Sequence, residues 1–431
     1  MRGEMSVVRT VEHFSQKLND IKYLSQVSVG RCGGVMLGPA AISAAAGGSV
    51  HHLTATARRI TVHRLLALAG MLTLAATAVA DDTIPTTGRA IYRAACSSCH
   101  GADGRGAPAS LVGFSDPVPD FTDCDFAARE PDSDWVGIAY EGGPSRGFSE
   151  LMPAFKGALS VEQAQLAVNY IRSFCTDTRW PRGELNLPRA LITGKAYPED
   201  EAVITTLIDA EGEGSILNKL VYEQRFGPRS QWEIVVPFGW LETPNTIDDD
   251  GTTRWASSMG DIALAVKHTV HHSYEKGSIV SVAGELILPT GDSELGFGNG
   301  TTVFEPFVVW GQILPADFFL QTQLGLELTA DKDKAENAAF LRAALGWTTT
   351  TGEFGRAWSP MVELTAGREF ASDADIQYSV VPQIQITLNK RQHIMFNIGL
   401  RAPLNNRDVR TTQIVFYLLW DWFDGTLFEG W

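Results

Sequence analysis

The sequence of 431 residues has little cysteine, no excess of basic residues and no apolar run long enough for a transmembrane helix. Five cysteines are too few for a disulfide scaffold. With 35 Lys+Arg against 50 Asp+Glu, nothing basic is left over to neutralise phosphates, so we expect no nucleic-acid partner. A charged fraction of 20% and a hydrophobic fraction of 44% exclude a disordered chain, and the length favours two or more domains.

An apolar stretch of about ten residues begins after Arg64 and is followed by Ala78-Val79-Ala80. A basic flank, a short apolar core and small residues at its end are typical of a secretory signal. We expect residues 1–80, an upstream extension plus signal peptide, to be removed. A mistaken upstream start accounts best for residues 1–60, with a genuine cytoplasmic extension as the alternative. The mature protein would be exported and acidic.

A C-x-x-C-H motif follows, formed by Cys96-Ser97-Ser98-Cys99-His100. This is the attachment motif of c-type haem, in which both thiols add to the porphyrin and the histidine binds iron. A redox dithiol would need a βαβ setting, and a zinc site would need a second closely spaced pair of ligands. The sequence offers neither, so it predicts one covalently bound haem c.

Met152, in Leu151-Met152-Pro153, is the only methionine between His100 and the end of this domain. It follows His100 by 52 residues, which is enough chain to reach the far face of a haem. A thioether ligand raises the reduction potential relative to a second histidine. Core filling is the alternative for a single methionine. Further on, Ser160 is suited to cap a final amphipathic helix.

Residues 82–178, within a domain expected at 81–178, resemble the class I cytochromes c over a whole domain. The resemblance implies an all-α fold around one haem, attached at Cys96 and Cys99 with His100 and Met152 as axial ligands. It also implies one-electron transfer between Fe(II) and Fe(III) with periplasmic redox partner proteins. Because Met152 would close the sixth iron position, we expect no enzymatic activity.

Two further cysteines, Cys124 and Cys175, lie outside that motif. In an exported protein they can pair as a disulfide, and two separate buried thiols are the alternative.

After a linker at residues 179–198, the period of the sequence changes to two. Leu320, Leu324, Leu326 and Leu328, for example, alternate with Gln321, Gln323, Gly325 and Glu327. We predict an antiparallel transmembrane β-barrel over residues 199–431, with about 12 strands. The segments are 199–209, 214–227, 230–242, 256–273, 278–290, 301–314, 317–330, 337–351, 359–370, 376–389, 393–405 and 410–422.

Strand length and loop asymmetry favour a membrane barrel over a soluble β-sandwich, whose strands would alternate in the same way. Connections expected on the periplasmic side are short, except near residues 352–358. The last strand is dense in aromatic residues, which suits a membrane border. They are Phe416, Tyr417, Trp420, Trp422 and Phe423.

Met259-Gly260-Asp261 and Leu288-Pro289-Thr290-Gly291 are similar to motifs of outer-membrane porins grouped with the transporter of the meta pathway of phenol degradation. That resemblance implies a channel-like barrel in outer-membrane lipid that transports small organic solutes. If the haem domain is an electron carrier, a small reductant is a further candidate for passage through the barrel.

A twelve-stranded barrel has a backbone diameter of roughly 24 Å, whereas a domain of this size measures about 30 Å. We therefore expect the haem domain at the periplasmic mouth. The preferred function is electron transfer by a haem domain that the barrel holds at the outer membrane. The alternative is a solute porin whose haem domain acts as a plug or redox sensor.

Overall fold

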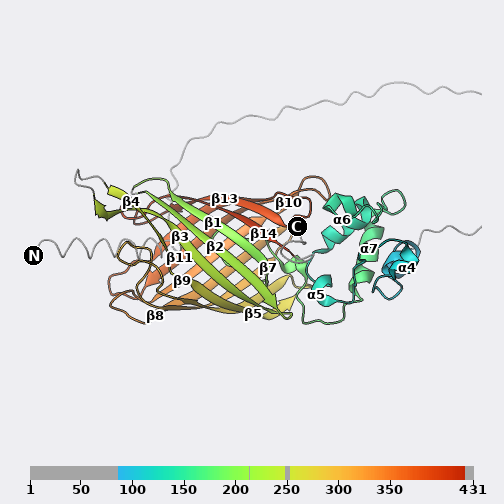
Figure 1. Cartoon of the computed structure of the whole chain (residues 1–431), viewed down its shortest axis with the longest axis horizontal. Helices are drawn as coiled ribbons and strands as arrows, with labels where there is room; N and C mark the ends of the chain where they lie inside the picture. The colour runs from blue at the N-terminus through green and yellow to red at the C-terminus, as the bar shows by residue number, and fades with distance from the viewer. Residues whose placement is uncertain (1–85, 213, 248–252, 423–431) are drawn as a thin grey trace, which may run out of the picture. The chain divides into compact units, whose positions relative to one another are not determined.

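The computed structural model describes residues 86–212, 214–247 and 253–422, the coloured parts of Figure 1. The expected signal peptide and upstream extension lie outside the described residues, as does Phe423. Within the described part, helices are followed by strands, as the change of sequence period predicts.

Short helices occupy residues 88–185, here called the helical region. They are α2 (Gly88–Ile91), η1 (Tyr92–Cys96), α3 (Ser97–His100), α4 (Ala109–Val112), α5 (Cys124–Ala127), α6 (Asp132–Glu141), η2 (Gly143–Arg146), α7 (Val161–Arg172) and η3 (Gly183–Leu185). Tyr92, Trp135 and Val168 are among the buried residues of their common core. The predicted cap of the last long helix is present. Ser160 and Gln163 each accept a hydrogen bond from the other's backbone N–H, a capping box that starts α7.

Antiparallel strands follow and form a closed barrel, because β1 pairs with β2 on one side and with β14 on the other. The strands are β1 (Glu201–Asp209), β2 (Ser215–Phe226), β3 (Ser230–Ile247), β4 (Thr253–Met259), β5 (Ala263–Ser273), β6 (Ser278–Ile287), β7 (Val303–Ile313), β8 (Phe318–Thr329), β9 (Ala338–Trp347), β10 (Thr349–Thr350), β11 (Ala357–Glu369), β12 (Gln377–Thr387), β13 (Ile394–Pro403) and β14 (Gln413–Asp421). β4 and β5 both pair with β3, and β9 and β10 both pair with β11. Each of these two pairs acts as one strand of the wall, so the barrel has the predicted 12 strands.

The two faces of the barrel are reversed relative to a soluble protein. In β8, Leu324 is 60% exposed on the outside, whereas Gln323 and Glu327 are each 3% exposed on the inside. An apolar exterior around a polar interior is stable only in lipid, and closure leaves no open strand edge. The soluble sandwich is thereby excluded, and the barrel is an outer-membrane barrel.

One expected side-chain direction is wrong. Tyr417 points into the lumen rather than to the membrane border, and it is 1% exposed. Its hydroxyl donates to the Arg189 carbonyl and contacts the Gln385 side chain at 2.8 Å. Tyr417 lies one residue from Phe416, so alternation places the two on opposite faces.

Within the part of the chain that the structure describes, no helix is long and apolar enough to cross a membrane.

The connections between strands fall into two sets, one at each mouth of the barrel. The mouth where β1 starts and β14 ends also carries the turns after β2, β5, β7, β10 and β12. Because short turns face the periplasm in such barrels, we call this end the periplasmic mouth.

Candidate functional site

The Cys96–His100 motif lies where two kinds of helix meet. The π-helix η1 ends at Cys96, and the α-helical turn α3 runs from Ser97 to His100. π-helical turns are rare and are found mostly at functional sites. Cys96, Cys99 and His100 are all half-buried. One short helical stretch therefore holds both sulfurs and the imidazole.

The packing of α2 against α7 sets the position of this stretch. A Cβ atom on Gly88 would overlap the carbonyl oxygen of Leu166, so only glycine allows the helices to approach this closely. Further along the same face, the Tyr92 hydroxyl donates to the Gly101 carbonyl at 2.7 Å. The end of α3 is thus tied to the core.

The protonation of the motif argues against a reactive dithiol. Burial, followed by the charge of Cys99, raises the pKa of the Cys96 thiol to about 11. Reactive dithiols need a lowered thiol pKa. Burial also lowers the pKa of His100 to about 4, so its imidazole is neutral at neutral pH. A neutral imidazole is the form that binds a metal.

The surroundings of His100 fit a haem. Its ring stacks on Phe121, with centroids 4.9 Å apart. Its Nδ1 atom is buried and has no hydrogen-bond partner among the described residues. Two thiols in the spacing of the attachment motif, next to a buried neutral imidazole, are the donor set that a c-type haem requires.

Met152 lies on a separate turn that the backbone holds in place. Its carbonyl accepts from the Gly143 N–H at 2.9 Å, and its own N–H donates to the Ser149 carbonyl at 3.2 Å. A Cβ on Gly143 would overlap Ser149, so glycine is needed for this close approach. The half-buried thioether is therefore carried by an ordered turn.

Cys124 and Cys175 form a disulfide in the structure, with their Cα atoms 5.2 Å apart. The bond ties the start of α5 to the chain just after α7. The sequence separation of the two cysteines is 51, and the loop that they close contains Met152.

The helical region and the barrel belong to one compact unit and share buried polar contacts. Arg129 forms an ion pair with Asp200 at 2.7 Å, and the second Asp200 oxygen accepts the Arg225 N–H at 2.9 Å. His393, in the turn after β12, lies with Nε2 2.8 Å from a Glu130 oxygen. These contacts all involve the periplasmic mouth, where the size comparison had placed the haem domain.

The longer turn between β10 and β11, residues 351–356, belongs to the same contact. Its Phe354 packs against the helical core and lies 5.9 Å from Tyr140, measured between ring centroids. The Phe354 carbonyl accepts a hydrogen bond from Arg146, which is also paired with Asp134 at 2.6 Å. This turn departs from the short-turn rule because it contacts the helical region.

The segment between the two domains, residues 186–200, runs inside the barrel, and we call it the lumenal segment. The sequence predicted a linker at residues 179–198, and it gave no sign of this position. Glu363, in β11, accepts from the backbone N–H groups of Ile192 and Thr193 at 3.2 and 2.6 Å. The segment is therefore bound to the barrel wall and does not act as a loose tether.

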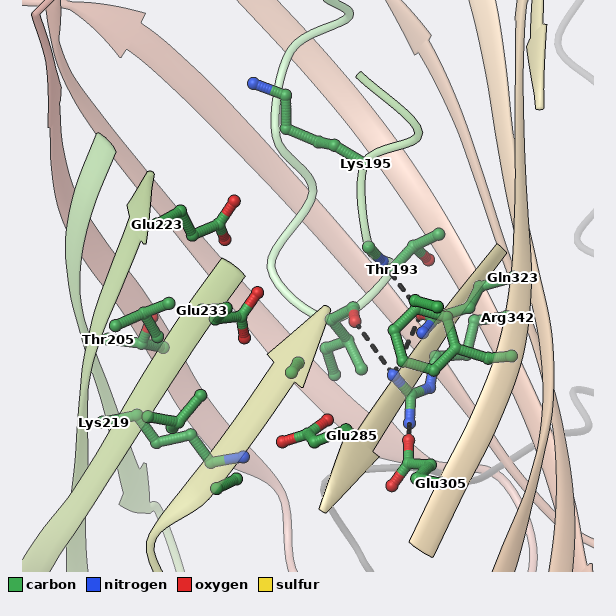
Figure 2. Close-up of a pocket in the computed structure, with 18 of the residues that line it drawn as sticks. Thr193, Lys195, Thr205, Lys219, Glu223, Glu233, Glu285, Glu305, Gln323 and Arg342 are labelled. Atoms are coloured by element: carbon green, nitrogen blue, oxygen red, sulfur yellow. Dashed lines mark hydrogen bonds and ion pairs between the residues drawn. The ribbon is translucent and has the colours of Figure 1, made fainter. Parts of the chain in front are cut away.

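A cavity of about 240 Å³ remains beside the lumenal segment (Figure 2). Arg342 lies between the segment and the wall, 3.4 Å from the Ile192 carbonyl and 3.8 Å from Glu305. Carboxylates and basic groups both line this space. They include Glu223, Glu233, Glu285, Lys219 and Lys267.

Two family models match the chain. Residues 84–171 match the family described as cytochrome c oxidase, cbb3-type, subunit III. Residues 214–427 match the family described as "Putative MetA-pathway of phenol degradation". The chain is therefore a c-type cytochrome domain joined to a porin-like barrel, most of which matches that second family model.

Solved barrel structures are similar only at a low level. The KdgM porin is 8% identical with a TM-score of 0.32, and the match covers 51% of this chain and 98% of that one. The NanC porin is 8% identical with a TM-score of 0.36 and the same coverage. The β domain of the Bordetella autotransporter BrkA is 11% identical with a TM-score of 0.31, covering 51% of this chain and 96% of that one. Similarities this weak carry no information on what the barrel transports. No curated protein matches the chain.

Sequence reasoning located the cytochrome motif and the barrel but missed the residues that join them. Asp200 and His393 stand at the first residues of two predicted strands, just before β1 and β13 begin, and Phe354 stands in a turn without periodicity. The one available signal was the unusual length of the turn near residue 352.

Proposed function

We propose that the protein is an electron-transfer cytochrome whose haem c is bound through Cys96 and Cys99, with His100 and Met152 as axial ligands. The barrel would hold this domain at the periplasmic face of the outer membrane. The observation that carries the proposal is the C-x-x-C-H motif on an ordered helical stretch, in a domain fixed to the periplasmic mouth. When bound, the haem would supply a one-electron Fe(II)/Fe(III) couple.

Residues of the chain would hold the haem and orient its ligands. His100 is kept neutral and oriented by burial and by its stacking on Phe121. Met152 is held on a hydrogen-bonded turn inside the loop that the Cys124–Cys175 disulfide closes. If His100 and Met152 both bound the iron, no coordination site would be left for a substrate, which supports a carrier rather than an enzyme.

A surface for a redox partner protein lies near the same turn. Leu111, on α4, is 78% exposed, and Leu151, next to Met152, is 46% exposed. The Ser149 hydroxyl donates to Asp116 at 2.8 Å, which connects the segments that carry the two leucines. We propose that these two leucines contribute to the transient docking of a periplasmic partner.

The second candidate is a porin for small organic solutes, with the cytochrome domain as plug or redox sensor. The family match of the barrel and its polar, partly open lumen favour it. Against free diffusion stands the lumenal segment, which occupies part of the same space.

The proposal is tested by covalent haem in the matured protein. Haem is expected to stay on the chain after denaturation and to be lost in the Cys96→Ala/Cys99→Ala variant. Ser98→Ala, an exposed change inside the same motif, is the matched control and should keep its haem. A wild-type chain without covalent haem would refute the proposal.

A further inference from the structure

We propose that the lumenal segment is a gate, which closes the barrel while it is paired with the wall and opens a pore when it is released. The proposal goes beyond electron transfer and does not depend on it. Three features of the segment carry it: its backbone contacts, its charges and its attachment to the helical region.

The backbone of residues 188–196 has no regular structure, and barrel side chains provide its hydrogen-bond partners. Gln383 and Gln323 accept from the N–H groups of Leu191 and Gly194, each at 2.9 Å. On the carbonyl side, the donors are Gln321 to Pro188, Asn397 and Tyr417 to Arg189, Lys267 to Lys195, and Ser281 to Ala196. The wall thus binds an irregular peptide backbone through polar side chains of seven strands, β5, β6, β8 and β11–β14.

The charges of the segment match carboxylates of the wall. Arg189 forms ion pairs with Glu223, at 2.9 Å, and with Glu201. Lys195 forms an ion pair with Glu199 within the segment itself and lies 3.7 Å from Glu201 in the wall strand β1. Release of the segment would leave Glu201 and Glu223 without these partners and exposed to lumen water.

The wall carboxylates continue around the barrel as a row. Glu201 is directly opposite Glu223, and Glu223 is opposite Glu233. Across β5 and β6 the same row reaches Glu285, which is opposite Glu305. Like charges opposite one another destabilise a sheet, so a barrel interior that served only as packing would not favour them. Five carboxylates of the wall line the cavity, Glu223, Glu233, Asp261, Glu285 and Glu305, against three basic side chains of the wall, Lys219, Lys267 and Arg342. Release of the segment would also withdraw Arg189 and Lys195, and the net acidic lining that remains is the kind that makes a pore cation-selective.

Attachment to the helical region gives the gate a means of control. Asp200, at the end of the segment, binds Arg129 at 2.7 Å. The Tyr197 hydroxyl donates to the Ala128 carbonyl at 3.4 Å. A change in the docking of the helical region would therefore act directly on the C-terminal end of the segment.

The test is conductance of the haem-loaded full chain in planar lipid bilayers. Glu363→Gln removes an acceptor oxygen from the group that binds Ile192 and Thr193, and it should raise the open probability about tenfold. Glu275→Gln, the same change in an exposed periplasmic turn, is the control and should conduct like the wild type. The open pore should prefer cations in a salt gradient.

A cysteine pair separates gating from a general loss of structure. An ideal Cβ on Gly194 lies 3.5 Å from Gln323 Cδ, so Gly194→Cys/Gln323→Cys can be joined by a short thiol-reactive crosslinker. The pair should open readily before crosslinking, because the Gln323 contact is lost, and should stay closed afterwards. If Glu363→Gln conducts no more than Glu275→Gln, or if the crosslinked pair conducts like the free one, the segment is not a gate.

Discussion

Removal of the Cys124–Cys175 disulfide should destabilise the cytochrome domain by an amount that follows from the loop it closes. The cysteines are separated by 51 residues. In the chain-entropy model a loop of this length restricts the unfolded chain by about 4 kcal/mol at 25 °C. Such a loss is a large part of the 5–15 kcal/mol that stabilises an ordinary domain.

The assay is urea unfolding of the full, haem-loaded chain, monitored by haem absorbance, for the wild type and for Cys124→Ala/Cys175→Ala. We expect a lower midpoint and a loss of about 4 kcal/mol in the free energy of unfolding. Wild-type protein reduced by a mild phosphine keeps every side chain and should show most of the same loss. A loss below about 1 kcal/mol in both samples would refute the reasoning from loop closure.

Three further changes test other parts of the structure. Gly88→Ala should lower the free energy of unfolding of the cytochrome domain by about 1–3 kcal/mol, because its Cβ has no room beside Leu166. Thermal unfolding measures this change. An unchanged unfolding midpoint would contradict the close helix crossing. Arg129→Gln leaves Asp200 buried without its ion-pair partner and should weaken docking of the helical region to the barrel by about 3 kcal/mol. Proteolytic cleavage after residue 175 should then be faster than in the wild type. An unaltered cleavage rate would contradict this expectation. Met152→His should lower the reduction potential in a redox titration, and an unchanged potential would mean that Met152 is not a ligand.

Most of the fold could be predicted because it depends on local patterns. Alternation in single strands, such as Leu324 beside Gln323, fixes which face meets lipid, and it placed most of the strands within two or three residues. The hairpin of β3 and β4 is longer than predicted, since β3 continues to Ile247 and β4 begins at Thr253. The haem motif is likewise local, since Cys96, Cys99 and His100 lie within five residues on one continuous helical stretch. The capping box at Ser160 belongs to the same class.

The lumenal segment could not be predicted, for a physical reason. Its backbone is bound by side chains such as Glu363 and Gln383, about 170 to 190 residues away in sequence. A segment without regular structure has no periodic sequence pattern. In addition, the inward polar residues of a barrel give the same alternating pattern whether they face water or a peptide. The predicted direction of Tyr417 was wrong for a related reason. Its aromatic ring suits a membrane border, but its hydroxyl donates a hydrogen bond to the Arg189 carbonyl inside the barrel.

The docking of the two domains also rests on contacts between distant residues. Glu130 and His393 are separated by 263 residues, and each is an ordinary polar residue in its own sequence context. The contact between Glu130 and His393 follows only from the position of the helical region at the periplasmic mouth. That position is therefore the point on which the functional account depends.

The most direct test of the central claim, a redox-active haem at the periplasmic mouth, is reduction of the haem from one side at a time. The haem-loaded protein is placed in liposomes in one orientation, a membrane-impermeant reductant is added to one face, and haem absorbance is recorded. We expect rapid and complete reduction from the periplasmic face. From the extracellular face, reduction should be slow in the wild type and faster in Glu363→Gln. The account would be contradicted by a haem that cannot be reduced from the periplasmic face. It would also be contradicted if, with the Gly194→Cys/Gln323→Cys pair crosslinked, the haem were reduced faster from the extracellular face than from the periplasmic face.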